Sequence, residues 1–280
     1  PDRRGIAVKW KWVLGVVAAS ILLLYVAVYL FLSGYDYNGL KPEITHAVKA
    51  GTGRELTLGG DIRLKPGFTP ALVVKDVSFQ NASWGSRPNL ATIKRFEIKV
   101  RLLPLLSRRV EVKRLILIEP EILFERDISG TSNLAFETTK KQDLTKEKDD
   151  TKAGGDWKLS ARSFKELQIE KGRINYIDHE LKKTYGATVD TLMATAASST
   201  SPTRLALKGA YNDQSFEVAG TFCPLTAFIN PDKAWPVNLA VKTDNATLTL
   251  DGTVKDPLAR LGIELNFTLK GKDLASLKQF

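Results

Sequence analysis

Apolar and polar side chains alternate with a period of two over most of the chain beyond residue 50. The pattern is clearest at residues 96–102 and 263–270, and it recurs at 237–241 and 248–254. Successive side chains of a β-strand point to opposite faces, so each run indicates a strand with one apolar and one hydrated face. We therefore predict a mainly β fold.

Helical patterns are short beyond the first segment of the chain. Residues 38–50 form an amphipathic pattern that Gly51 would end, and brief helices are expected at 103–106, 225–229 and 273–277. No segment is long enough for a helical crossover, so we expect antiparallel pairing. The alternation fits an open sheet or a closed β-sandwich whose apolar faces pack together, and by itself it favours the commoner sandwich.

The segment Val13–Leu32 is a run of 20 uncharged, mostly apolar residues. A helix of that length spans ~30 Å, the thickness of a bilayer core. A cleaved signal peptide is the alternative, but its apolar part is only ~7–15 residues long. Residues 1–12 form a basic tail, which predicts a cytoplasmic N-terminus and a body on the other side of the membrane. The candidate anchor residues are Trp12, Val13, Leu22, Leu23, Leu24, Leu30 and Phe31.

Residues 138–156 are rich in Lys, Asp, Glu and Thr and contain almost no apolar side chains. This composition predicts a charged flexible linker, and a solvated charged helix is the alternative. The linker divides the body into an N-terminal β segment, 35–137, and a continuing β segment, 157–280. Because the chain begins with Pro1 and its last strand pattern runs up to its end, we expect it to be part of a longer protein.

Two strand-like stretches on either side of the linker resemble each other. Leu115, Leu117, Pro120, Ile122 and Phe124 match Leu167, Ile169, Gly172, Ile174 and Tyr176 at a constant offset. A structural repeat of this kind indicates a sheet that extends by adding similar strands.

No catalytic or metal-binding constellation is recognisable. His46 and His179 are the two histidines, and Lys183 stands where an H-E-x-x-H motif would need its second histidine. The lone Cys223 excludes an internal disulfide and is expected to be a small buried hydrophobe. We therefore expect no enzyme activity, no catalytic residue, no metal and no cofactor.

The net charge of +10 is spread thinly outside the basic tail. Nucleic-acid binding would need a dense basic cluster, so we do not expect a nucleic-acid partner. Weak attraction to anionic lipid headgroups fits this charge distribution better.

Several short strings stand out along the chain: Leu40-Lys41-Pro42, Gly53-Arg54-Glu55-Leu56, Asn81-x-x-Trp84-Gly85-Ser86, Leu102-Leu103-Pro104-Leu105-Leu106-Ser107, Leu123-Phe124-Glu125-Arg126-Asp127 with Gly130 and Asn133, and Gly172-Arg173-Ile174-x-Tyr176-x-Asp178. Together they resemble the N-terminal region of the AsmA family of Gram-negative envelope proteins. The resemblance implies an inner-membrane anchor and a periplasmic antiparallel β-sheet that is curled into an open apolar groove. It is similar to bridge-like lipid transfer proteins and implies a role in outer-membrane lipid homeostasis. Members are usually longer, and the insert at 138–156 departs from the pattern.

The resemblance favours the open groove over the sandwich, and the groove would carry phospholipid acyl chains. Burying a ~16-carbon chain removes roughly 13 kcal/mol of hydrophobic cost at ~0.8 kcal/mol per methylene group. Roughly 14 strands at ~4.8 Å spacing would give a trough of ~65 Å. The candidate lining residues are Phe96, Ile98, Val100, Leu102, Leu115, Leu117, Ile122, Phe124, Ile174, Tyr176, Leu205, Leu207, Phe216, Val218, Leu239, Val241, Leu248, Leu250, Leu265 and Phe267.

The expected partners are the inner-membrane bilayer, phospholipid (or detergent in its place) and other envelope proteins. Two other functions are compatible with the same strands. One is a membrane-tethered scaffold whose sheet edges bind client strands or assist outer-membrane protein assembly. The other is an anchored sandwich with a purely structural role.

Overall fold

The computed structural model describes residues 4–67, 69–101, 109–136, 158–160, 165–198, 201–224, 234–256 and 261–271. The helices are α1 (Arg4–Gly34), the 3₁₀ helix η1 (Asn38–Leu40) and α2 (Lys41–Thr52). The strands are β1 (Leu56–Leu58), β2 (Arg63–Lys65), β3 (Ala71–Gln80), β4 (Asn89–Val100), β5 (Arg109–Arg126), β6 (Lys158–Ser160), β7 (Glu166–Asp178), β8 (Lys183–Ala196), β9 (Thr203–Tyr211), β10 (Gln214–Phe222), β11 (Trp235–Lys242), β12 (Ala246–Asp256) and β13 (Leu261–Gly271).

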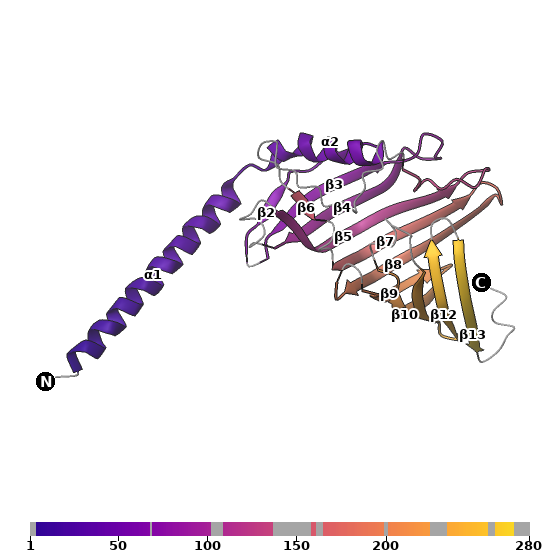
Figure 1. Cartoon of the computed structure of the whole chain (residues 1–280). Helices are drawn as coiled ribbons and strands as arrows, with labels where there is room; N and C mark the ends of the chain where they lie inside the picture. Colours follow the sequence, from indigo (N-terminus) through magenta and orange to yellow (C-terminus); the bar gives the residue numbers. More distant parts are fainter. Residues whose placement is uncertain are drawn as a thin grey trace.

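All the described strands belong to one 13-stranded sheet, in which the order β1-β3-β4-β5-β7-β8-β9-β10-β11-β12-β13 forms an open path. Figure 1 shows the strand direction rotating steadily from β3 to β13, as the right-handed twist of strands requires. The mainly β prediction is confirmed. The 11 strands of the path give a width of only about 48 Å at ~4.8 Å per spacing, less than the ~65 Å expected.

The expectation of purely antiparallel pairing is wrong for two pairs, both of which involve β5. β5 pairs in parallel with β7, and also with the short β6, while the other pairs are antiparallel. A parallel connection needs length rather than a helix, and the segment between Arg126 and Glu166 supplies it. The internal repeat noted in the sequence is this pairing, because Leu115 lies opposite Leu167 and Phe124 opposite Tyr176.

The N-terminal helix α1 projects away from the sheet in Figure 1. Its helical character agrees with the pattern of residues 13–32. Over the part of the chain that the structure describes, however, no helix meets the length and hydropathy needed to cross a bilayer, so the transmembrane span is not confirmed. The side chain of Phe31 is outside the described set.

The amphipathic helix expected at 38–50 is present as η1 and α2, but it does not end at Gly51. It continues to Thr52, and Gly53 adopts a left-handed conformation (φ 72°) with its N–H bonded to the carbonyl of Lys49 at 2.8 Å. Gly53 is therefore the C-terminal cap. The linker 138–156 and the three brief helices expected at 103–106, 225–229 and 273–277 lie outside the described residues.

The first strands carry the main buried cluster. Ile62, Val74 and Val77 form its centre, and Tyr37 and Ile44 from the helical segment pack against it. The helical segment thus covers one face of the sheet at β1–β4. Farther along, each strand makes its substantial contacts with its sheet neighbours, and no other described element packs broadly on β7–β13.

A line of charged residues crosses the sheet from β3 to β8. These residues lie on adjacent strands, and in the strand registers they have no paired residue on the neighbouring strand. We call them the charged crease: Asp76, Lys94, Glu119, Lys171 and Asp190. Three of them have positive φ: Asp76 (52°), Glu119 (50°) and Lys171 (53°). Residues other than glycine reach this region at a cost of roughly 1–2 kcal/mol each. The crease is thus a costly local conformation that recurs on β3, β5 and β7.

The crease also shifts the phase of the alternation. On β5 the apolar positions are odd before Glu119, as at Leu117, and even after it, as at Ile122. Both sets nevertheless lie on one face, because a Cβ added to Gly172 would contact the side chains of both Ile169 and Pro120, on opposite sides of the crease. The apolar face therefore stays continuous across the bend.

The later strands bend by another device. Gly220 on β10 and Gly252 on β12 have φ of 148° and 154°, and a Cβ at either would overlap a carbonyl oxygen of the next strand, that of Asn238 or Glu264. Only glycine permits so close an approach of two strands. The sheet thus consists of a creased half, β3–β8, and a glycine half, β9–β13.

Candidate functional site: an apolar sheet face with a polar edge

The strand register places the described candidate lining residues on a single face, which we call the apolar face. Pairs such as Ile98 with Leu115, Leu207 with Val218 and Leu250 with Phe267 lie directly opposite each other from β4 to β13. The face therefore extends across both halves of the sheet. Leu102 lies outside the described residues.

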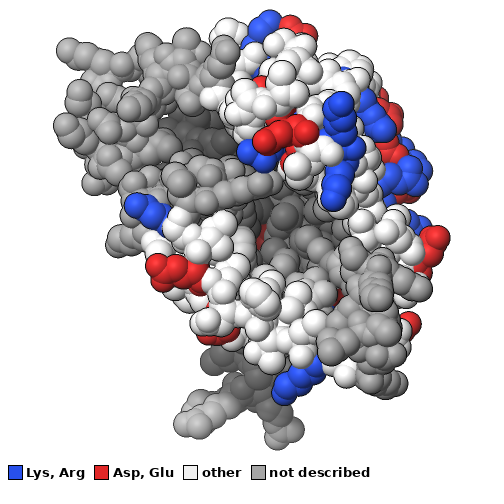
Figure 2. Space-filling view, turned by 90° about the vertical axis from the view of Figure 1, so that its right-hand side faces the viewer, with Lys and Arg blue, Asp and Glu red and all other residues white. Residues whose placement is uncertain are grey.

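Most of the apolar face is neither sealed nor fully exposed. Val100 is buried at 3% exposure and Phe267 is 74% exposed, whereas the other candidate residues are partly exposed. Side chains at the centre of a sandwich would be almost completely buried. In the view of Figure 2 the charged side chains of the described residues lie mainly toward the outside. The described residues thus form an open sheet.

The opposite face, the polar face, carries ion pairs between neighbouring strands. Lys208 pairs with Glu217 at 2.7 Å between β9 and β10, and Lys94 pairs with Glu119 at 2.8 Å at the crease. The hydrogen bond from Lys94 lowers the pKa of the Glu119 carboxyl, and Lys171 adds to the effect. A cavity of about 620 Å³ opens over the crease among these charges. Val77, Ile93 and Val189 line it beside the charged residues, so its lining is mixed.

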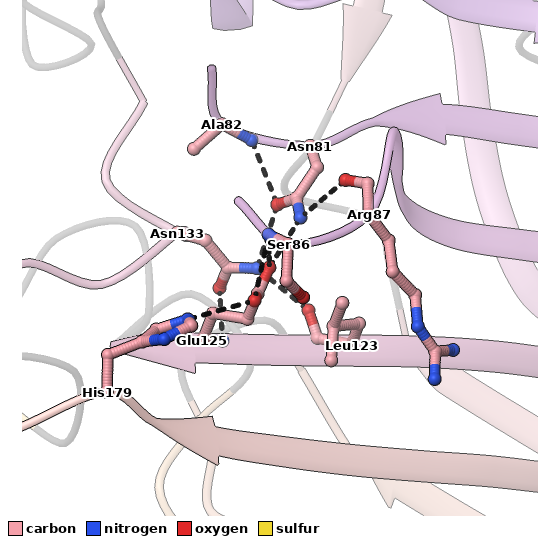
Figure 3. Close-up of polar contacts among 8 residues, drawn as sticks. All are labelled: Asn81, Ala82, Ser86, Arg87, Leu123, Glu125, Asn133 and His179. Carbon is pink, nitrogen blue, oxygen red and sulfur yellow. Dashed lines mark hydrogen bonds and ion pairs between the residues drawn. The ribbon is translucent and has the colours of Figure 1, made fainter. Parts of the chain in front are cut away.

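A buried network of polar side chains links several segments at one edge of the creased half (Figure 3). Its centre is Glu125 near the end of β5, whose side chain is 0% exposed. The carboxylate accepts hydrogen bonds from Asn81 Nδ2 at 2.6 Å and the backbone N–H of Ser86 at 3.0 Å, and it lies 3.2 Å from His179 Nε2. Asn133 links the network back to Asn81 and to the Leu123 carbonyl, at 2.9 and 2.8 Å.

Two opposing effects set the pKa of Glu125. Burial alone would raise it, but the hydrogen bonds from Ser86, Asn81 and His179 prevail, so the pKa lies below its ordinary value. Glu125 is therefore a carboxylate at neutral pH, and it joins β5 to donors from two other segments, the loop 81–88 and His179. Gly85 leaves room for this arrangement, because a Cβ there would overlap the Asn81 amide.

The network was not foreseen from spacing, but a signal for it existed. Asn81, Glu125 with Asn133, and Asp178 occur in three strings that resemble the family, and the structure brings these strings to one edge of the sheet. Among the described residues, no three His, Cys, Asp or Glu side chains are grouped as a metal site would need. Cys223 is 1% exposed, as expected for a small hydrophobe, and burial raises the pKa of its thiol to about 11.

Comparison with known proteins matches the strings to a family. The sequence model of the AsmA family matches residues 9–216. The AsmA family protein YhjG of Escherichia coli (strain K12) is 23% identical over an alignment of 294 positions, which covers 93% of this chain and 41% of YhjG. The chain thus spans about two fifths of the length of that relative. With the family pattern matched from the N-terminal helix to β10, the chain belongs to the AsmA family.

Proposed function

We propose that this chain is a periplasmic lipid-transfer segment anchored at the inner membrane, whose apolar face carries phospholipid acyl chains for outer-membrane lipid homeostasis. The observation that carries the proposal is the continuous, partly exposed apolar face from β4 to β13. Acyl chains lying on this face would replace water there, at a gain of ~0.8 kcal/mol for each buried methylene group. Membership of the AsmA family supports the same function.

A charge placed on the apolar face tests the proposal. Leu207→Asp puts a carboxylate among the side chains of β9, whereas the control Ala206→Asp puts one on the exposed polar face of the same strand. We expect phospholipid to co-purify with the unaltered protein and with A206D, and to be lost from L207D, with the sheet retained by circular dichroism. Equal lipid content in all three proteins would contradict the proposal. Val100 is unsuitable for this test because it is buried.

The proposed location rests on α1. Its apolar side chains are largely exposed, with Trp12 at 74%, Leu23 at 70% and Leu24 at 66%. A helix with so much exposed apolar surface is stable only against lipid or protein. We propose that α1 anchors the chain, with the basic tail cytoplasmic and the sheet in the periplasm. Replacing Leu22, Leu23 and Leu24 by Asp should release the protein from the membrane fraction, and its retention there would contradict this anchor.

A second candidate function is the tethered scaffold for envelope proteins. Over the described residues β13 pairs with β12 alone, so its other edge offers unpaired backbone groups to a client strand. Replacing Asn266 or Thr268 by Pro on β13 would block such pairing without touching the apolar face. Loss of co-purifying protein with lipid retained would favour the scaffold.

A further inference from the structure

Three loops lie together at the edge of the sheet that the polar network joins. They are the β3–β4 loop (81–88), the turn after β5 (127–131) and the β7–β8 turn (179–182). The Trp84 and His179 rings lie 6.4 Å apart, and the backbone N–H of His179 bonds to the carbonyl of Arg126 at 2.9 Å. We call this set the loop edge. The loop edge lies at the end of β3, whereas α1 lies near its beginning. This follows because α1 contacts β2, and β2 pairs with the first residues of β3.

Each of the three loops presents one large apolar side chain to the outside. Ile128 is 81% exposed, Leu181 is 60% exposed and Trp84 is 38% exposed. Isolated exposed side chains are normal on a protein surface, but here three lie at the tips of adjoining loops. Tryptophan in particular suits a boundary between water and hydrocarbon.

The tips are held rigidly from within. In the turn after β5, Asp127 Oδ1 accepts hydrogen bonds from the backbone N–H groups of Ser129 and Thr131 at 2.8 and 2.7 Å. In the β7–β8 turn, Asp178 Oδ1 accepts a hydrogen bond from the backbone N–H of Leu181 at 2.9 Å. The exposed side chains therefore project from preformed turns, so docking them onto a surface would cost little ordering entropy.

The charges of the loop edge that remain unpaired are positive. The three loops contain two acidic residues: Asp127 is bonded to its own turn, and Glu180 pairs with Arg126 at 3.4 Å. Arg87 and Lys182 form no ion pair with any described residue, and Arg87 points away from the polar network in Figure 3. Lys183, the next residue along the chain, is likewise exposed and without an ion pair in the described structure.

We propose that the loop edge docks on the surface of an anionic phospholipid bilayer, with Trp84, Ile128 and Leu181 entering the headgroup layer and Arg87, Lys182 and Lys183 contacting phosphates. Protruding apolar tips flanked by cations suit a bilayer, since a protein partner would need a separate pocket for each tip. Docking is independent of the proposed lipid transfer.

Docking at the loop edge would also place the apolar face next to the bilayer, a consequence that rests on the proposed function. The rings of Tyr176 and Tyr185 lie 6.1 Å apart on the apolar face, directly behind the β7–β8 turn. Phe124 lies opposite Tyr176 on β5. An acyl chain leaving a bilayer at the loop edge would therefore meet the apolar face at once.

An environment-sensitive fluorophore attached to Ile128→Cys in the full chain tests the docking. Cys223 is 1% exposed and its thiol pKa is raised to about 11, so labelling should be confined to the new cysteine, which the unaltered protein checks. The matched control is Thr268→Cys on the exposed polar face of β13. The protein is held in neutral phosphatidylcholine nanodiscs, and phosphatidylglycerol vesicles are then added.

We expect a blue shift at position 128 and none at position 268. Replacing Arg87, Lys182 and Lys183 by Gln should weaken vesicle binding by about fivefold for each cation. No shift at 128, equal shifts at both positions, or a shift that needs an added protein in place of lipid would overturn the docking proposal. Lipid co-purification by the same variants reports separately on lipid transfer.

Discussion

The creased half and the glycine half of the sheet bend by different physical means. In β3–β8 one charged residue on each of β3, β5 and β7 adopts a left-handed conformation, and ion pairs such as Lys94–Glu119 lie over the bend on the polar face. In β9–β13 glycines on the apolar face let neighbouring backbones approach. Both devices leave the apolar face continuous. The two halves therefore share a continuous apolar face but not a common way of bending.

The largest effect is expected from adding a side chain in the glycine half. Gly220→Ala or Gly252→Ala would force apart two strands, because the new Cβ overlaps a carbonyl oxygen of the neighbouring strand. We expect a loss of about 3 kcal/mol in the free energy of unfolding, measured by urea denaturation. Gly186→Ala is the control in the creased half, where the nearest atom is the Asn175 side-chain oxygen at 3.2 Å. A loss as large in the control would show that the close approach is not the cause.

Glu125 makes the creased half sensitive to acid through a carboxylate that is completely buried. Because its folded-state pKa is lowered, its stabilising contribution is complete above the unfolded value of about 4.3 and is lost as the pH falls through the folded value. Glu125→Gln should cost about 2 kcal/mol at neutral pH, since its amide would face donors.

Urea denaturation of both proteins across the acid range checks this pH dependence. The difference in stability between the unaltered protein and E125Q should shrink as the pH falls. A constant difference would mean that the carboxylate charge is not what holds the three segments together.

The backbone of the crease can be tested at Lys171, whose φ is 53°. A β-branched residue is strongly disfavoured there, whereas glycine is not. We expect Lys171→Val to lower the free energy of unfolding by about 2 kcal/mol and Lys171→Gly to change it by less than about 1 kcal/mol. Glycine is thus tolerated at the crease, whereas it is required at Gly220 and Gly252 in the glycine half. Equal effects of Val and Gly would refute the left-handed conformation.

The smallest effect is expected from the ion pair at the crease. Both partners are largely exposed, so Glu119→Gln should lower the unfolding midpoint only slightly. The difference should disappear at ~1 M salt, where the screening length is ~3 Å. The effect of Gly220→Ala should persist at the same salt concentration. If the change in unfolding midpoint caused by Glu119→Gln did not depend on salt, the ion pair would not stabilise the crease electrostatically.

Much of the sheet and of its apolar face could be predicted from the sequence. Period-two alternation indicated the strands, and the constant offset between Leu115 and Leu167, interpreted as a repeat, coincides with the register in which β5 and β7 pair. The parallel direction of that pair was missed, because direction depends on the connection rather than on the pattern. The spacing of three between Leu117 and Pro120, and again between Ile169 and Gly172, was the visible trace of the crease.

Other features had no local signal. A positive φ at Glu119 or Lys171 cannot be inferred from residue type, since charged residues are not favoured in that region. The contact of Glu125 with His179 joins residues far apart in the sequence, so only the sheet order brings them together. The end of α2 was misplaced because Gly51 and Gly53 are both glycines, and only the left-handed backbone at Gly53 identifies the cap.

The most direct measurement of the central claim is site-specific photocrosslinking of lipid to the sheet. Benzoylphenylalanine is placed at Leu207 on the apolar face, and at Ala206 on the polar face of the same strand. If acyl chains lie on the apolar face, phospholipid should crosslink at position 207 and not at position 206 when membranes containing the protein are irradiated. Absence of lipid adducts at 207, or adducts of equal yield at both positions, would contradict the account.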